Sequence, residues 1–278
     1  MENENPKLKK FMTRDEPNKN NHPRIGEVNY KFSGSPMIIT DYRNNADIDV
    51  CIINILSDGT IKYNNICNRM YNHFKNGKDI KSPYDKATCG IGYIGEGYRP
   101  KDVPEIYRFW NHMLTRTNSI EFKIQSPSYK DVKLHPWFEN FQNFIKWYNL
   151  NYYKFPNEKM CVDKDIIFKG NKIYGPDTCC FVPERINLLF LNRKALRGNL
   201  PIGVYFENYS QKYCIEINKF KKRFKTSEEA FYVYRARKLS YIKEVADDYL
   251  YNKGGMNIPQ FRDVVYPAML RYDIEITD

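Results

Sequence analysis

The sequence predicts an α+β protein with a small N-terminal β unit, a helical region that contains two strands followed by a helix, and a C-terminal three-stranded sheet packed on one long helix. Three observations lead to this prediction. Runs rich in β-branched residues, separated by turn sequences, fill residues 36–64. Apolar residues recur at steps of three and four between residues 138 and 152. Three short extended runs then precede a helix-capping sequence at residues 226–229.

Composition favours a polyanionic partner and a reducing compartment. The 278 residues are enough for two or three domains, and 44 Lys and Arg against 33 Asp and Glu give a net charge of +11. The seven cysteines form no C-x-x-C pair, which argues against a thiolate zinc site and for reduced thiols in the cytoplasm. No apolar run is long enough to span a membrane, and the N-terminus lacks the apolar stretch of a signal peptide, so we expect no membrane partner.

The N-terminal third divides into an arm and a β unit. Residues 1–33 are polar and rich in Asn, Lys and Glu, and we expect a flexible arm because they offer little apolar surface to bury. Residues 34–89 form the small β-rich unit. Its strands are predicted in PMIITDY, DIDVCIINI and TIKYN, joined by turns at RNNA and SDGT.

Residues 90–198 make up the second region. The glycines of GIGYIGEG lack the spacing of a phosphate-binding loop, so we interpret them as a linker turn. Pro104 suits the first position of a helix. One apolar helical face follows, which we interpret as core and not as a base-stacking platform; its residues are Phe138, Phe141, Ile145, Tyr148 and Tyr152.

The pattern becomes extended from Met160 onwards. MCVDKDIIF is predicted as a strand, KGNK as a tight turn in which Gly170 and Asn171 can adopt positive φ, and TCCFV as a second strand. Pro183 can start a helix, PERINLLFLNRK, which leads into a basic linker made of Arg193, Lys194 and Arg197.

Residues 199–253 form the C-terminal module. IGVYF, KYCIEI and KFKKRFK are predicted as three antiparallel strands. The T-S-E-E sequence at 226–229 is a capping box that opens a long helix, with Phe231, Tyr234, Tyr241 and Val245 on one side. Residues 254–278 contribute a short closing helix and an acidic tail.

Oxygen-bearing side chains in the strand–turn–strand–helix segment suggest a metal site. Asp163 lies at the hairpin, and Asn187 lies on the helix that follows it. Carboxylate and amide oxygens suit Mg²⁺ or Mn²⁺, and one such ion can stabilise the leaving oxygen when a phosphodiester bond breaks.

The order of V-D, G-N-K, an aromatic–Val strand and P-E-R-I-N resembles the HNH, or ββα-metal finger, endonucleases of phages and homing elements, over about residues 90–195. The resemblance implies that Asp163 and Asn187 bind the metal and that Asn171 ties the hairpin loop. Lys164 takes the position of the family's catalytic histidine. The candidate catalytic residues are therefore Lys164, acting as a neutral amine, and Asp165 as general base.

A general base supplied from elsewhere in the chain is the other possibility for such an enzyme. His112 and His135 are the candidates, because histidine exchanges a proton near neutral pH. For each of them a structural role is the competing interpretation. The finger-like segment that resembles the HNH enzymes also has a competing interpretation: it is a structural scaffold that has lost its catalytic general base.

Residues 201–247 resemble the DNA-binding domain of plant ethylene-response factors. Gly203-Val204, the K-Y-C-I-E-I strand and the T-S-E-E-A-F helix start carry this resemblance. It implies that the three-stranded sheet lies in the major groove, with arginines and aromatic residues reaching the bases. Here tyrosines stand at two such positions, in place of arginine and tryptophan. The predicted DNA-binding residues are Tyr205, Lys212, Tyr213, Lys219, Lys221, Lys222, Arg223 and Lys225.

Two classes of function follow from the sequence. One is a DNA endonuclease of phage type with one Mg²⁺ or Mn²⁺ ion, no other small-molecule cofactor and double-stranded DNA as its partner, in a bacterial or phage-infected host cytosol. The alternative is a catalytically inactive DNA-binding protein with a regulatory or interfering role. A third class is a protein-binding module, but it does not explain why the positive charge is clustered. For the lysines of residues 219–225, the structural alternative to DNA contact is a solvated edge strand whose charges prevent aggregation.

Overall fold

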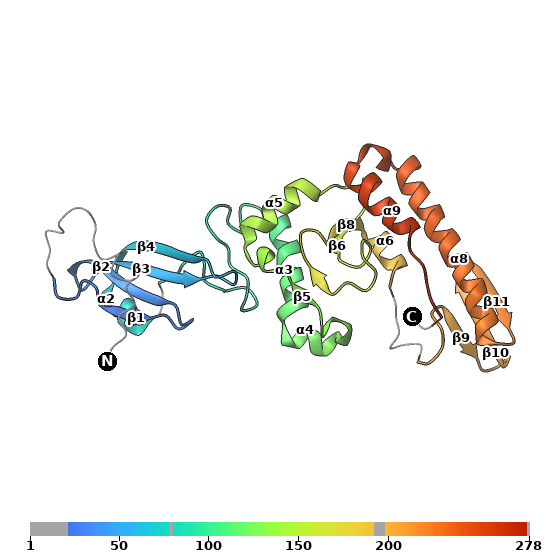
Figure 1. The fold of residues 1–278 in the computed structure, drawn as a ribbon, viewed down its shortest axis with the longest axis horizontal. Coiled ribbons are helices and arrows are strands. Elements are labelled where there is room, and N and C mark those ends of the chain that lie inside the picture. Colours follow the sequence, from blue (N-terminus) through green and yellow to red (C-terminus); the bar gives the residue numbers. More distant parts are fainter. Residues whose placement is uncertain (1–21, 78–79, 192–197, 277–278) are drawn as a thin grey trace. The chain divides into compact units, whose positions relative to one another are not determined.

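The computed structural model describes residues 22–77, 80–191 and 198–276 and confirms the α+β class (Figure 1). The chain forms two compact units. Unit 1 consists of residues 1–107 and 139–142, and unit 2 of residues 108–138 and 143–278. The five-part division expected from the sequence stays a prediction. Most of the expected flexible arm, residues 1–21, and the basic linker residues Arg193, Lys194 and Arg197 lie outside the described residues.

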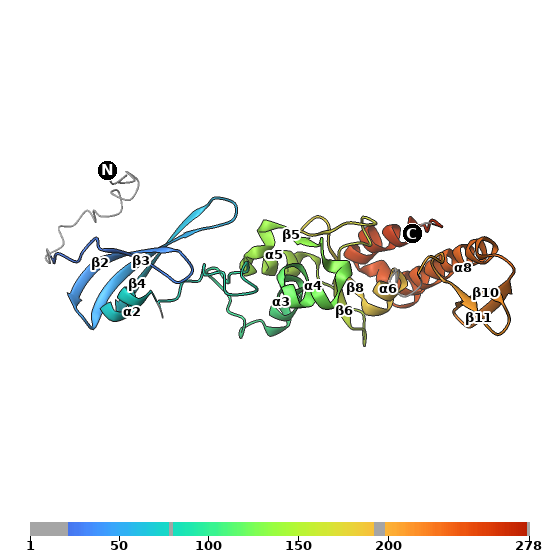
Figure 2. The ribbon, with the colours of Figure 1, turned by 90° about the horizontal axis from the view of Figure 1, so that it is seen from below.

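Unit 1 is built on a four-stranded antiparallel sheet in the order β1-β2-β3-β4. The elements are β1 (Val28–Tyr30), β2 (Pro36–Asn44), β3 (Asp47–Ile55), β4 (Ile61–Arg69) and α2 (Tyr71–Asn76). The helix α2 lies against one face of the sheet (Figure 2), where Phe74 packs with Met37, Val50 and Ile52. The three strands predicted after residue 35 are confirmed. The expectation of a flexible arm over residues 1–33 is wrong for Val28–Tyr30, because these residues form β1 and pair with β2.

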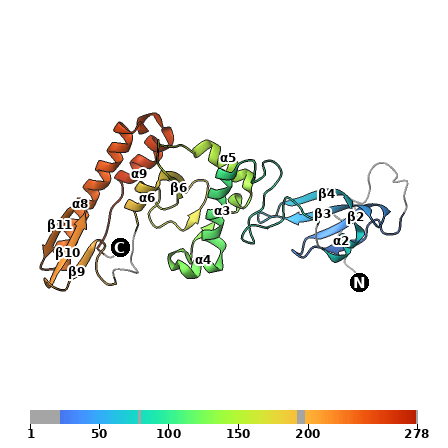
Figure 3. The ribbon, with the colours of Figure 1, turned by 180° about the vertical axis from the view of Figure 1, so that it is seen from behind.

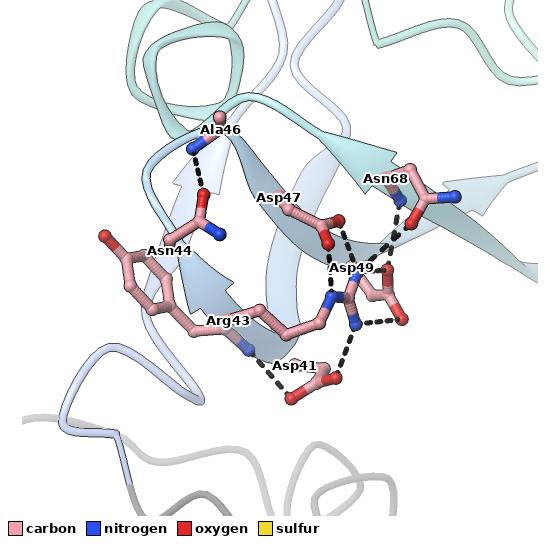
Figure 4. A network of polar contacts seen from close by, with 8 residues as sticks. Asp41, Arg43, Asn44, Ala46, Asp47, Asp49 and Asn68 are labelled. Carbon is pink, nitrogen blue, oxygen red and sulfur yellow. Dashed lines mark hydrogen bonds and ion pairs between the residues drawn. The ribbon is translucent and has the colours of Figure 1, made fainter.

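A network of ion pairs joins the strands of unit 1 around Arg43 (Figure 4). Its guanidinium donates to Asp41 at 2.6 Å, to Asp47 at 2.6 Å and to Asp49 at 2.7 Å. Asn68 of β4 joins the same network through its backbone N–H, which donates to Asp49 at 3.1 Å. One cation therefore holds carboxylates from β2 and β3 together.

The first half of unit 2 is helical. Its elements, some of which cross the boundary with unit 1, are α3 (Pro104–Asn118), α4 (Ile120–Gln125), η1 (Pro127–Tyr129), β5 (Lys133–Leu134), η2 (Pro136–Glu139) and α5 (Phe141–Asn151). The helix predicted to start at Pro104 is confirmed. The apolar face predicted over residues 138–152 is largely buried, with Phe138 and Phe141 fully inaccessible to solvent.

The two strands and the helix predicted from residue 160 are present, but the first strand is shorter than expected. The elements are β6 (Met160–Asp163), β7 (Ile173–Tyr174), β8 (Cys180–Pro183) and α6 (Glu184–Leu189). The strand β6 ends at Asp163 because its carboxylate accepts the backbone N–H groups of Asp165 and Ile166, both at 2.7 Å, which turns the chain. In the turn, Gly170 has φ +79, whereas Asn171 does not have positive φ.

The C-terminal module combines a three-stranded antiparallel sheet with the long helix α8, which lies along the sheet (Figures 1 and 3). Its elements are β9 (Val204–Glu207), β10 (Lys212–Ile217), β11 (Phe220–Phe224), α8 (Ser227–Asp247), η3 (Asp248–Asn252), η4 (Gly255–Asn257), η5 (Gln260–Val265) and α9 (Tyr266–Leu270). The helix start predicted at Thr226 is confirmed, since the Thr226 hydroxyl caps α8 by accepting the Glu229 N–H at 3.2 Å. Across the described ranges, no helix has the length and apolar character needed to cross a membrane.

Candidate nucleic-acid interface

The C-terminal sheet presents one face to α8 and the other away from it. On β10, Tyr213, Ile215 and Ile217 belong to the cluster that packs on α8. Because side chains alternate along a strand, Lys212, Cys214 and Glu216 point to the opposite face, which we call the outer face. The register pairs Cys214 with Arg223 on one side and with Tyr205 on the other, so these residues also lie on the outer face.

Glu207 organises the cations of the outer face. Its side chain is only 8% exposed, and its carboxylate accepts hydrogen bonds from Arg223 Nε at 2.5 Å and Lys221 Nζ at 3.2 Å. The Ser210 hydroxyl donates to the same carboxylate at 2.7 Å. The hydrogen bond from Arg223 is the main cause that holds the pKa of Glu207 well below its usual range. These contacts fix the positions of two cations on the sheet.

Two tyrosines complete the outer face. Lys221 Nζ lies 5.8 Å from the centre of the Tyr205 ring, and the Arg223 guanidinium carbon lies 5.4 Å from that of Tyr209. An Arg223 Nη2 N–H also donates to the Tyr209 hydroxyl. Tyr209 is 77% exposed, so an aromatic ring stands beside the guanidinium at the surface. The sequence interpretation missed Glu207 and Tyr209, because only the strand register brings them beside β11.

The eight predicted DNA-binding residues do not form one surface. Tyr205, Lys212, Lys221 and Arg223 belong to the outer face. Tyr213 and Lys222 point to the other side, Tyr213 against the core and Lys222 with its Nζ 5.4 Å from the Phe224 ring.

The remaining two predicted residues lie at the ends of β11. Lys219 has φ +66 and forms the tight turn between β10 and β11 together with Asn218 at φ +43. Lys225 follows the end of β11, directly before the cap of α8. The four lysines at and beside β11 therefore divide between the two faces of the sheet, the turn before β11 and the residue after it, and only part of the cluster can meet one partner surface.

The finger-like segment is held by side-chain contacts to its backbone. Asn171 Nδ2 donates to the carbonyls of Lys164 at 2.9 Å and Ile173 at 2.8 Å, and Asn171 Oδ1 accepts the Ile173 N–H at 3.1 Å. Asn171 thus ties the two sides of the loop between β6 and β8. Asn187 lies in α6, and its side chain has no hydrogen-bonding partner within the part of the chain that the structure describes.

Lys164 is a structural cation in this loop. Its side chain is 8% exposed, and its Nζ donates to the carboxylate of Asp165 and to the carbonyl of Asn171, the latter at 3.0 Å. An ammonium engaged in this way has no lone pair with which to accept a proton. The Asp165 carboxylate is engaged by the same ammonium. The two candidate general bases are therefore bound to each other.

Of the two histidine candidates, His135 lies beside the finger-like segment, since its backbone N–H donates to the Tyr174 carbonyl of β7 at 2.8 Å. His135 Nδ1 accepts the backbone N–H of Trp137 at 3.2 Å, which is a structural contact. His112 is exposed on α3. Partial desolvation is the main cause that lowers the pKa of His112, and nearby positive charges lower it further.

The donor atoms around Asp163 do not fit a resident divalent ion. Its Oδ1 already accepts two backbone N–H groups, burial raises the pKa of its carboxyl, and the neighbouring Lys164 ammonium supplies positive charge. Over residues 22–77, 80–191 and 198–276 there is no group of three or more His, Cys, Asp or Glu arranged to hold a metal. Binding of Mg²⁺ or Mn²⁺ by Asp163 and Asn187 therefore stays a prediction.

The positive charge of the chain is concentrated in one unit. Unit 2 carries 28 Lys and Arg against 18 Asp and Glu, whereas unit 1 carries 16 against 15. The outer face of the C-terminal sheet belongs to unit 2. An anionic polymer is therefore attracted to the unit that carries this face.

Comparisons with known proteins do not supply a function: no protein-family model, no curated protein and no solved structure matches this chain. Function has to be inferred from the residues themselves.

Proposed function

We propose that the protein binds double-stranded DNA through the outer face of its C-terminal sheet and that its finger-like segment serves as a scaffold. The observation that carries the proposal is the paired placement of Arg223 and Lys221 beside exposed aromatic rings, in the unit that holds nearly all of the excess positive charge. A two-layer module with a cationic sheet face suits the major groove, which admits flat β elements. The cytosolic location expected from the sequence belongs to this proposal.

The ion pairs with Glu207 are compatible with DNA binding. A guanidinium has five N–H donors, and the contacts to Glu207 and Tyr209 use those at Nε and Nη2. The remaining donors of Arg223 can reach a phosphate or the acceptor edge of guanine. The fixed side chain also loses less conformational freedom on binding than a mobile one would.

The scaffold part of the proposal is supported by Lys164. Because this ammonium ties Asp165 to the Asn171 carbonyl, it stabilises the loop at the position where an HNH enzyme needs a base. The alternative of metal-dependent nicking requires a base at that position, where the Lys164 ammonium donates to one oxygen of the Asp165 carboxylate.

A salt-dependent binding titration with duplex DNA tests the DNA-binding part. Arg223→Gln and Lys221→Gln should each weaken binding and reduce the slope of log K against log salt by about 0.9, the value for one lost phosphate contact. Lys243→Gln is the matched control, since it removes one charge from the C-terminal half of α8, where Lys243 pairs with Asp247 at 2.6 Å. Equal effects of all three variants would show that the outer face has no special role.

Relaxation of supercoiled plasmid tests the scaffold part. We expect no relaxation with Mg²⁺ or Mn²⁺ at any pH between about 6 and 9, the range in which general bases act. Relaxation by the unaltered chain that disappears in Asp163→Ala would overturn the scaffold interpretation and place catalysis in the finger.

A further inference from the structure

The turn between β9 and β10 is braced by side-chain hydrogen bonds. The Ser210 hydroxyl donates to the Glu207 carboxylate at 2.7 Å, and Gln211 Nε2 donates to the Asn208 carbonyl at 2.6 Å. Gln211 has φ +52, so the turn closes with a residue in the left-handed region. Tyr209 lies between these bonded residues, and its backbone therefore has a defined position.

The Tyr209 side chain stands at the surface of this turn. It is 77% exposed, so most of the area of its ring is open to solvent. Its hydroxyl accepts an N–H from Arg223 Nη2, and Arg223 is itself held by Glu207. The ring is therefore anchored at its hydroxyl end while much of its flat surface stays accessible. An anchored side chain loses little conformational freedom when a ligand binds.

An accessible ring face beside two cations suits an unpaired nucleotide. Aromatic side chains stack on the face of a base, and neighbouring cations such as Lys221 and Arg223 contact the phosphates. In a fully paired duplex, each base is stacked between its neighbours and presents only its edges in the grooves. The face of the Tyr209 ring therefore finds a stacking partner only where a base has left the stack.

We infer that Tyr209 stacks on an unpaired base, and that the preferred ligand of the outer face is duplex DNA interrupted by an unpaired nucleotide. This inference rests on the proposed function, because the paired flanks supply the phosphates that Lys221 and Arg223 contact. Taking a base out of an intact duplex costs unstacking and unpairing free energy, and the cost is smallest for a base that has no pairing partner. The turn thus selects duplexes by their structure and not by their base sequence.

Titration of the full chain with two duplexes of the same flanking sequence tests this preference. One duplex is fully paired, and the other carries a single unpaired thymine. The unaltered chain should bind the interrupted duplex more tightly by a factor on the order of ten, the size of one base–aromatic stack. Tyr209→Leu should abolish this difference, whereas Tyr209→Phe, which keeps the ring and loses the hydroxyl, should retain most of it. Tyr232→Leu is the matched control, since Tyr232 is a 62% exposed tyrosine on α8, and it should leave the ratio unchanged.

Photocrosslinking gives a second result that a purely structural role of Tyr209 would not produce. With 5-iodouracil as the unpaired base, irradiation should link the DNA to the peptide that contains Tyr209, and mass spectrometry identifies that peptide. The fully paired duplex with 5-iodouracil at the same position should give no such product. Loss of the preference in Tyr209→Phe as well as in Tyr209→Leu would mean that the hydroxyl acts through Arg223, which would overturn the stacking role.

The same titration separates this inference from the proposed function. Equal affinity of the unaltered chain for the two duplexes would overturn the inference and leave the proposed function standing. Binding of the interrupted duplex alone would overturn the proposal that the sheet binds fully paired DNA, while the stacking role would stand. Absence of binding to either duplex would overturn both.

Discussion

At the scale of single residues, the carboxylate of Glu207 decides how the outer face of the C-terminal sheet is arranged. It joins Lys221 and Arg223, which follow it by 14 and 16 positions in the sequence. The cations of β11 were predictable because they are adjacent in the sequence. Their common partner was not, because the pairing crosses β10 and depends on the strand register.

Acid should weaken the contribution of Glu207 to stability. Its folded-state pKa is depressed by Arg223, so the stabilisation is fully present above the ordinary glutamate pKa of about 4.3 and is lost as pH falls towards the folded value. Glu207→Gln should therefore destabilise β9–β11 at pH 7 and make less difference at about pH 3, where part of the stabilisation is already lost because the unfolded wild type binds a proton that the folded carboxylate does not bind.

Hydrogen exchange of the β10 amide groups in wild type and Glu207→Gln measures this difference. Glu216→Gln is the matched control, since it removes a carboxylate from the same face without breaking the bonds to Lys221 and Arg223. A gap between wild type and Glu207→Gln that stays the same at both pH values would contradict the assigned role.

At the scale of elements, short sequence patterns were sufficient to predict the helices and strands whose bounds depend on neighbouring residues. Pro104 and Thr226 mark two helix starts, and β10 was predicted at its observed bounds. Two features depended on contacts that the sequence does not reveal. The carboxylate of Asp163 ends β6 early. The strand β7 pairs in parallel with β5, so Ile173 finds its partner at Lys133, far away in the sequence.

The entry into β9 requires glycine for two reasons. Gly203 has φ +76, and an added Cβ would lie 2.1 Å from the Tyr234 ring. Gly254 has a similar φ of +84 but open space around the same position. Gly254→Ala should cost about 1–2 kcal/mol for the left-handed backbone alone, whereas Gly203→Ala should add about 1–3 kcal/mol for the steric conflict.

Urea unfolding of the two glycine variants measures these costs side by side. Both positions belong to unit 2, so the comparison stays within one compact unit. Equal destabilisation by the two substitutions would show that the sheet and α8 can separate enough to admit a methyl group.

At the scale of the whole molecule, the two units differ more in net charge than in fold class. Both units combine helices and strands, but nearly all of the excess of Lys and Arg belongs to unit 2. The net charge of the chain predicts an anionic partner, and this stays a prediction. The concentration of the charge in unit 2 could not be predicted from the sequence, because the unit boundary depends on three-dimensional contacts.

Lysine acetylation with and without duplex DNA should map the contact surface. We expect protection at Lys212 and Lys221 on the sheet. Lys62 and Lys101 in unit 1 should react equally in both samples. Mass spectrometry of the acetylated peptides gives the result, and protection confined to unit 1 would contradict the assignment of DNA binding to unit 2.

The Arg43 network has a consequence for the way a duplex can approach unit 1. Three carboxylates surround a single guanidinium at the corner where β2, β3 and β4 meet (Figure 4), so the local charge is negative in a basic protein. Phosphates brought to this corner would be repelled, and like charges in contact oppose association. If the protein binds DNA as proposed, this corner repels the duplex and so limits the orientations in which the two can associate.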